Sequence, residues 1–107
     1  MKVRLGDLAH VRASRHGPDL SLAVIAWGEA EYARLARQMT VARLRAVLGR
    51  RSAARVVRHD LPSLHALIFV LRGVAEEPAS RLRIDPAGQL LSSRLLFLEF
   101  DKEPELL

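Results

Sequence analysis

The sequence lacks several features that define large classes of proteins. It contains no cysteine, which excludes disulfides, thiol catalysis, cysteine-ligated iron–sulfur clusters and thiolate zinc sites. Its longest apolar-rich stretches, residues 20–27 and 64–71, are far shorter than the roughly 20 residues of a membrane span. The first seven residues carry charges and hold no apolar segment of the kind found in signal peptides. We therefore expect a cytoplasmic protein with no membrane segment.

The motifs of the common enzyme classes are missing as well. The six glycines never cluster, so the sequence has neither a dinucleotide-binding fingerprint nor a P-loop. The four histidines form no HExxH motif or other close ligand pair, and no serine lies in a G-x-S-x-G elbow. Asp60 and Asp85 fall at expected turns and give no support for a paired-carboxylate catalyst. We expect no metal site, no cofactor and no catalysis by this chain on its own.

The chain nevertheless has the material for a stable core. Half of its 107 residues are hydrophobic, and no repeat or linker divides it. We predict a single domain over residues 1–107. The polar tail, residues 102–107, is expected to be frayed.

Positive charge is concentrated in one segment. The sequence has 17 basic and 12 acidic residues, and Lys2 and Lys102 are the only lysines. Residues 43–58 hold six arginines and no acid, which suits nucleic acid, an acidic partner or an anionic substrate, or else a solvated helix end. Aromatic residues make up only 5% of the chain, and the RNP pattern of RNA-binding sheets is absent, so nucleic-acid binding is not expected.

Alternating polarity and turn signals predict several strands. The turn signals are Gly17-Pro18 within residues 14–19 and the hairpin sequence Asp-Pro-Ala-Gly at residues 85–88. The predicted strands are residues 8–13, 20–27, 55–59, 81–85 and 89–100.

Helical spacing predicts two helices between the second and third strands. Apolar residues from Tyr32 to Met39 fall on one helical face, and Thr40 is placed to cap a second short helix that ends near Gly49. Residues 64–73 fit a buried helix, with a strand as the alternative because Phe69 and Val70 fill the gaps in the helical pattern. A loop is expected at residues 76–78.

This order of elements predicts an α+β domain with one mostly antiparallel sheet and helices on one face. The last strand, residues 89–100, holds four consecutive apolar residues at 95–98, which point to both faces of a sheet. We therefore expect the face without helices to be covered by another subunit. The alternative is that the chain's own termini and loops bury this run.

Several segments resemble one known family in the right order along the chain. The sequence LGDLAHVR at residues 5–12 resembles the opening of the small C-terminal domain of the acyclic terpene utilisation protein AtuA family. The likeness continues through LAVIA at 22–26, LPSLHAL at 61–67, FVL at 69–71, LRID at 82–85, Gly88 and Leu95-Leu96. The resemblance implies a ferredoxin-like fold in its separate single-domain form, with a large AtuA-like protein as partner.

The sequence departs from this family in its polar loops. Family members typically have a run of the kind Ser-Gly-Asp-Lys-Gly-Asp where this chain reads ASRHGP at residues 13–18. The family's glycine-rich loop is replaced by the acidic and stiff Glu76-Glu77-Pro78, and family asparagines are Ser63 and Ile68 here. If these positions form a ligand site in the family, this chain has lost it or changed its ligand.

Three functional hypotheses follow. The first is an accessory or structural subunit without catalysis of its own, which forms a homo-oligomer or docks on a larger AtuA-like protein through its sheet. The second is a small-molecule-binding component of an enzyme complex that uses His10, Arg12 and His65, for which structural roles are the alternative. The third is a nucleic-acid-binding module that uses the arginines of residues 43–58.

Overall fold

The computed structural model describes residues 2–48, 55–74 and 95–101. Its elements in chain order are β1 (Lys2–Arg4), α1 (Leu5–Leu8), β2 (Ala9–His16), β3 (Asp19–Ala26), α2 (Glu29–Gln38), α3 (Val41–Leu48), β4 (Arg55–Leu61), the 3-10 turn η1 (Pro62–Leu64), β5 (Ala66–Arg72) and β6 (Glu99–Asp101).

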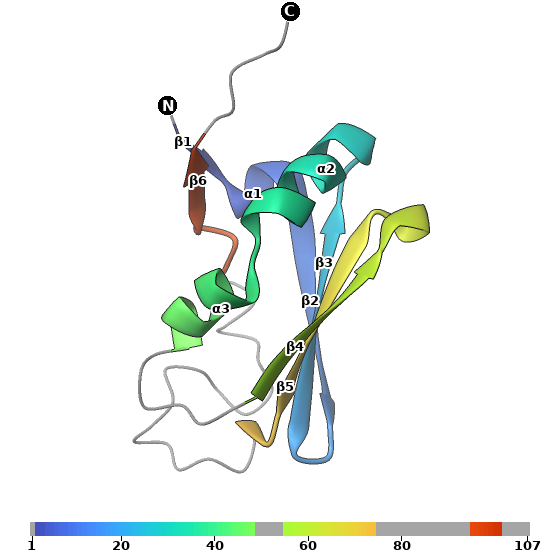
Figure 1. Ribbon diagram of the computed structural model, residues 1–107, viewed down its shortest axis with the longest axis vertical. Coiled ribbons are helices and arrows are strands. Elements are labelled where there is room, and N and C mark those ends of the chain that lie inside the picture. The colour runs from blue at the N-terminus through green and yellow to red at the C-terminus, as the bar shows by residue number, and fades with distance from the viewer. Residues whose placement is uncertain (1, 49–54, 75–94, 102–107) are drawn as a thin grey trace, which may run out of the picture.

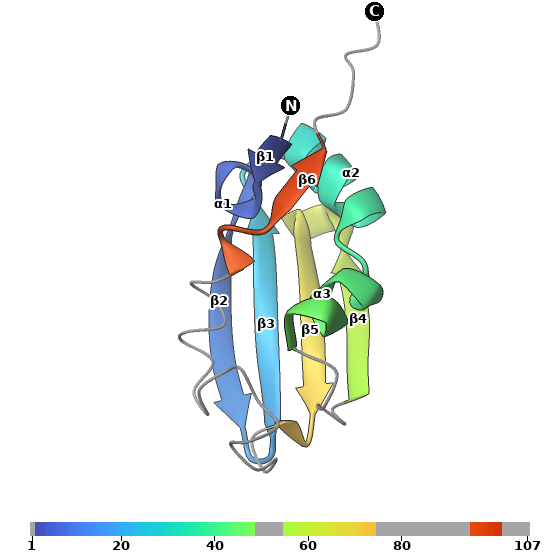
Figure 2. The ribbon, with the colours of Figure 1, turned by 90° about the vertical axis from the view of Figure 1, so that its left-hand side faces the viewer.

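The central element is a four-stranded sheet with the order β2-β3-β5-β4, in which every neighbouring pair is antiparallel. β1 and β6 form a separate antiparallel ribbon. Figures 1 and 2 show α2, α3 and this ribbon on the same side of the sheet. The predicted class, α+β with an antiparallel sheet and helices on one face, is confirmed.

The core lies between the sheet and the helices. Burial alternates strictly along β3, where Leu20, Leu22, Val24 and Ala26 are buried and the residues between them are only partly buried. Such alternation is what a strand produces when one of its faces meets the core. Leu35 of α2, Met39 directly after α2 and Leu44 of α3 fill the space opposite and are fully buried.

The two predicted helices are confirmed, together with the cap between them. Acidic residues stand in the first turn of α2, and Arg37 stands in its last, as the helix dipole favours. The Oγ1 atom of Thr40 accepts a hydrogen bond from the backbone N–H of Arg43 at 3.2 Å. This side chain therefore satisfies one of the donors that the start of α3 leaves without an intrahelical partner.

The helix favoured for residues 64–73 was wrong, and the alternative strand is observed. η1 covers Pro62–Leu64, His65 turns the chain with φ 53°, and β5 runs over Ala66–Arg72 between β3 and β4. The apolar residues fit a helical face, but they also fill both faces of a central strand. The β-branched residues Ile68 and Val70 favour the strand.

The long final strand expected over residues 89–100 is not observed within its described part, residues 95–100. Residues 95–97 form a turn, and only Glu99–Asp101 is a strand, which pairs with β1 rather than with the four-stranded sheet. The backbone N–H groups of Leu5 and Gly6 donate to the carbonyls of Leu98 and Leu96 at 2.8 and 2.9 Å. The start of α1 therefore gains acceptors from this turn.

This turn also changes where the apolar run 95–98 goes. Leu95 is fully buried against the core, whereas 65% of Phe97 is exposed and its ring lies 5.4 Å from the Arg4 guanidinium carbon. The run therefore covers part of the core and does not lie on the four-stranded sheet.

Three further differences concern element bounds. The β2–β3 hairpin extends to His16 and resumes at Asp19, so the turn comprises only Gly17 and Pro18, with φ 61° at the glycine. β1 and α1 were not predicted, because elements of three and four residues are too short to show periodicity. The predictions for Gly49 and for residues 76–78, 81–85, 85–88, 89–94 and 102–107 lie outside the described residues.

Candidate interaction surface

The sheet face opposite α2 and α3 is the candidate functional site, and we call it the open face. Paired residues of neighbouring strands share a face, so the register defines its members. Strand by strand, they are His10, Arg12, Ser14 and His16 of β2; Asp19, Ser21, Ala23 and Ile25 of β3; Ala66, Ile68, Val70 and Arg72 of β5; and Arg55, Val57, His59 and Leu61 of β4.

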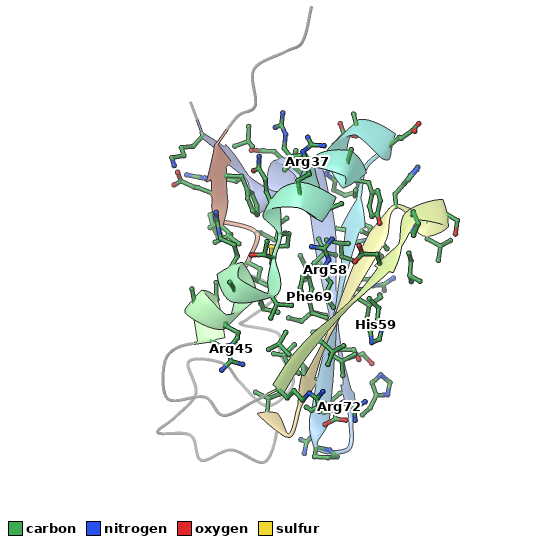
Figure 3. The ribbon with its side chains drawn as sticks, viewed as in Figure 1. Arg37, Arg45, Arg58, His59, Phe69 and Arg72 are labelled. Atoms are coloured by element: carbon green, nitrogen blue, oxygen red, sulfur yellow. The ribbon has the colours of Figure 1, made fainter. Side chains whose placement is uncertain are left out.

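The centre of the open face is apolar and only partly buried. Ala23 of β3, Ile68 of β5 and Val57 of β4 retain solvent exposure, although two of these strands lie in the middle of the sheet. No helix or strand in the described part of the chain covers them (Figures 1 and 2). In Figure 3, His59 points away from the helices, whereas Arg58 and Phe69 lie on the helix side.

Large apolar side chains extend this centre at one end of the sheet. Trp27, which follows β3, is 60% exposed, and Leu64 of η1 is 66% exposed. Leu61, at the end of β4, is 38% exposed. Exposed single residues are ordinary, but several at one end of an uncovered apolar face are typical of a contact surface.

No described contact joins all three residues that the sequence predicted as a ligand site. His10 and Arg12 share the open face of β2. His65 follows η1, its carbonyl accepts a hydrogen bond from the N–H of Ala26 at 2.8 Å, and its ring lies 6.1 Å from the ring of Tyr32 in α2. The described contacts therefore join His65 to the helix side, and none joins it to His10 or Arg12.

His10 is an unusual member of the open face. Its ring lies 5.0 Å from the ring of Trp27, and the indole Nε1 of Trp27 donates to the carbonyl of Gly6 at 3.5 Å. The Nδ1 atom of His10 is buried and has no hydrogen-bond partner. A buried ring nitrogen without a partner carries a desolvation cost, and His10 is the one such side chain among the described residues.

The charged residues of the open face are mostly positive. They comprise Arg12, Arg55 and Arg72 against Asp19. Arg55 and Arg72 lie directly opposite each other across β4 and β5. Oδ1 of Asp19 accepts the backbone N–H of Gly73 at 2.8 Å, and no described carboxylate forms an ion pair with any of the three arginines. Like charges placed opposite each other destabilise a sheet, so this arrangement favours an external anion.

The arginine-rich segment 43–58 forms no single patch in its described part. Arg43 donates to the carbonyl of Glu99, and its guanidinium carbon lies 4.7 Å from the centre of the Phe100 ring. This side chain ties α3 to β6.

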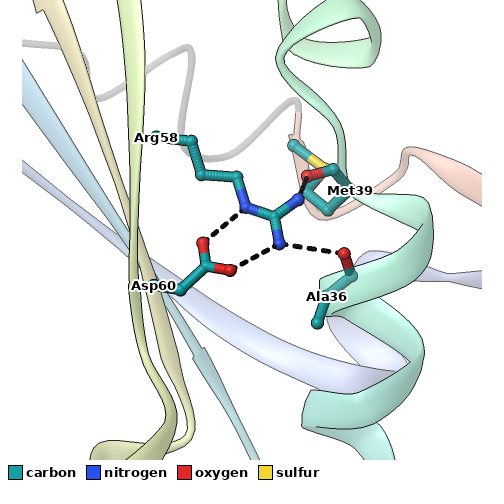
Figure 4. Close-up of polar contacts among 4 residues, drawn as sticks. All are labelled: Ala36, Met39, Arg58 and Asp60. Atoms are coloured by element: carbon teal, nitrogen blue, oxygen red, sulfur yellow. Dashed lines mark hydrogen bonds and ion pairs between the residues drawn. The ribbon is translucent and has the colours of Figure 1, made fainter.

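Arg58 is also engaged inside the molecule (Figure 4). Its guanidinium donates to the carbonyls of Ala36 and Met39, at 2.9 and 3.1 Å, where α2 ends. It also donates to both carboxylate oxygens of Asp60, at 2.7 and 3.0 Å. These contacts hold the pKa of Asp60 below its usual value of 3.8, chiefly through the hydrogen bond from Arg58.

Sequence reasoning missed this role of Arg58, which it grouped with the other arginines of residues 43–58. The sequence placed Asp60 at a turn after a strand that ended at residue 59, whereas β4 extends to Leu61. Arg58 and Asp60 are therefore two residues apart in one strand and share a face, a signal that the shorter predicted strand concealed. A cation on the core face of a strand needs an internal acceptor, and the carbonyls at a helix C-terminus provide one.

The fold and this surface define the class of protein: a small α+β domain of ferredoxin-like type, with helices covering one face of its sheet. A family model, the AtuA ferredoxin-like domain, matches residues 3–101, and the chain belongs to this family. The resemblance inferred from the sequence is thereby confirmed. Searches of the curated proteins and of the solved structures each gave no match.

Two further observations concern the described residues alone. None of their helices is long and apolar enough to cross a membrane. Among them, no three His, Asp or Glu side chains lie close enough together to hold a metal ion.

Proposed function

We propose that this chain is an accessory subunit that docks on a larger AtuA-like protein through its open face and carries out no catalysis of its own. The observation that carries the proposal is the apolar centre of the sheet that the described residues leave uncovered, formed by residues such as Ala23, Ile68 and Val57. Covering this centre removes apolar surface from water, which is the main driving force of protein association.

Membership in the family supports the choice of partner. The resemblance implies a domain that is found either fused to a larger AtuA-type domain or as a separate small protein. Both arrangements imply a larger AtuA-like protein as the partner of the domain. The matched segment, residues 3–101, includes every strand of the open face.

The exposed end of the sheet supports the same function. Trp27, Leu61 and Leu64 provide large side chains next to the apolar centre. Tryptophan is enriched among the few residues that supply most of the binding free energy in protein interfaces, which makes Trp27 the main anchor expected here.

The proposal is tested by co-expressing this chain with the larger AtuA-like protein of the same organism and purifying the small chain. We expect the two proteins to co-purify, and we expect Ile68→Asp on the open face to abolish the complex. Ala33→Asp is the matched control, because Ala33 is exposed on α2 and the substitution adds the same charge. A monomer that binds no such protein would contradict the proposal.

The fold of the variants is checked by circular dichroism. Val57→Asp serves as a second open-face variant, because β4 is an edge strand and tolerates substitution better than β5. Loss of the complex in both folded variants, but not in Ala33→Asp, assigns the contact to the open face.

A small-molecule contact at His10 and Arg12 is the second candidate, and the position of both side chains on the same face of β2 supports it. In this version the chain contributes these two side chains to a site completed by the larger protein. Arg12→Ala then lowers the activity of the complex without dissociating it. Full activity of the Arg12→Ala complex would remove this candidate.

A further inference from the structure

The charged residues around the apolar centre indicate what kind of partner surface is complementary to the open face. Arg12 lies on the β2 side, and the opposed pair Arg55 and Arg72 lies toward the end where β4 begins and β5 ends. Asp19 is the one acid of the open face, and its carboxylate accepts the backbone N–H of Gly73. A guanidinium group binds carboxylates through two parallel hydrogen bonds, so three such groups are matched by acidic side chains.

A second copy of this chain is a poor match for the same surface. In a two-fold symmetric, face-to-face dimer each open face meets another with three arginines and one aspartate. Like charges would then approach one another at the rim of the apolar centre, which opposes association. The charges therefore favour a different protein over self-association.

We propose that the partner of the open face is a protein surface with an apolar centre bordered by aspartate or glutamate side chains, which pair with Arg12, Arg55 and Arg72. This inference rests on the proposed function and specifies the partner's chemistry. The apolar centre supplies affinity, and the arginines select the partner and fix its orientation.

Arg72→Glu is the decisive variant. It turns the like-charged pair with Arg55 into an opposite-charged pair across β4 and β5, so the melting temperature stays the same or rises. The same change places a carboxylate against the acidic border of the partner. We expect the affinity for the larger AtuA-like protein to fall by a factor of about ten or more. A merely structural effect would lower stability and affinity together.

Arg15→Glu is the matched control. Arg15 is exposed on β2 but pairs with Leu20, so it lies on the face opposite to Arg12. We expect this charge reversal to change the affinity less than about twofold. Arg12→Glu, on the open face of the same strand, should reduce it as strongly as Arg72→Glu.

The measurement is a titration of the larger AtuA-like protein into each variant at about 50 mM and about 500 mM NaCl. Screening should weaken wild-type binding at high salt and affect Arg72→Glu less. One outcome separates the two proposals: Ile68→Asp abolishes the complex, but Arg12→Glu and Arg72→Glu leave its affinity unchanged. This result would contradict the inference that the partner has an acidic border, and it would leave the proposed docking through the open face intact. If wild-type protein forms no complex, both proposals fall.

Two other occupants are outcomes of the same set of variants. Binding of poly(U) by the wild type that is lost in Arg72→Glu would overturn the inference in favour of nucleic acid. A wild-type dimer, seen by light scattering and dissociated by Ile68→Asp, would overturn it in favour of a second copy.

Discussion

The same four strands form both faces of the sheet, yet the described residues cover only one of the two faces. On β5, Leu67 and Phe69 face the helices and are fully buried, whereas Ile68 and Val70 face the other way and are partly buried. Both faces of this strand are apolar. The comparison teaches that a strand with apolar residues on both faces needs both faces covered, and that the described residues cover only one of them.

The sharpest test of this comparison is a pair of neighbouring residues with side chains of identical composition. Leu67→Ala, on the covered face, should lower the free energy of unfolding by about 2–5 kcal/mol because it leaves a cavity in the core. Ile68→Ala, on the open face, removes the same number of carbon atoms and should lower the free energy of unfolding by at most about 1.5 kcal/mol. Urea denaturation measures both values, and equal losses would mean that the two faces are equally buried in solution.

The next test concerns what holds the helices on the covered face. Arg58→Ala removes four hydrogen-bond contacts, two of them to the carbonyls that end α2. We expect a loss of about 2–3 kcal/mol, because hydrogen bonds to a charged donor are the stronger ones and the cation also compensates the helix dipole. Arg55→Ala, on the same strand but on the open face, should cost no more than about 0.5 kcal/mol. Thermal melts of the two variants should therefore differ clearly.

A smaller effect is expected at the cap of α3. Thr40→Ala removes the acceptor of the Arg43 backbone N–H and should cost about 1 kcal/mol. Thr40→Ser keeps the hydroxyl and should recover most of the loss. If the Thr40→Ala and Thr40→Ser variants have the same melting temperature, the hydroxyl does not contribute to the stability of the domain.

The smallest effect is a dependence on acid at Asp60. Because Arg58 lowers the pKa of Asp60 in the folded protein, the ionised carboxylate stabilises the fold above the usual carboxyl pKa of 3.8. This contribution is lost as the pH falls through the lower folded-state value. Asp60→Asn should therefore flatten the stability profile below about pH 4, as measured by urea titrations at successive pH values. Identical acid profiles for the variant and the wild type would exclude this linkage.

The sequence predicts those parts of the fold that rest on local patterns. The alternation in residues 8–13, the helical spacing from Tyr32 to Met39 and the hydroxyl of Thr40 each correspond to an observed element or cap. Family likeness added the fold type, which periodicity alone does not specify.

The errors arose where tertiary contacts decide. Residues 64–73 satisfy both a helical and an extended pattern, and only pairing with β3 and β4 selects the strand. Residues 95–98 have the apolar pattern of a strand, but the carbonyls of Leu96 and Leu98 accept hydrogen bonds from the N–H groups of α1. These contacts span some ninety residues of sequence, and no local pattern indicates them.

The candidate site was partly predictable for the same reason. The shared face of His10 and Arg12 follows from strand alternation, whereas the position of His65 depends on the left-handed turn after η1. An uncovered apolar face was also expected, but from residues 95–98, which do not lie on the sheet. The residues that form it come from the central strands β3 and β5 and from β4.

The small ribbon of β1 and β6 bears on how such a domain can be attached to other proteins. Lys2 pairs with Asp101, so the two ends of the described chain leave from one corner, on the helix side (Figure 1). A tether joined at either end therefore starts away from the sheet surface that we assign to docking. Linked and free versions of the domain can thus present the same contact, and an affinity tag at either end leaves it accessible to a binding assay.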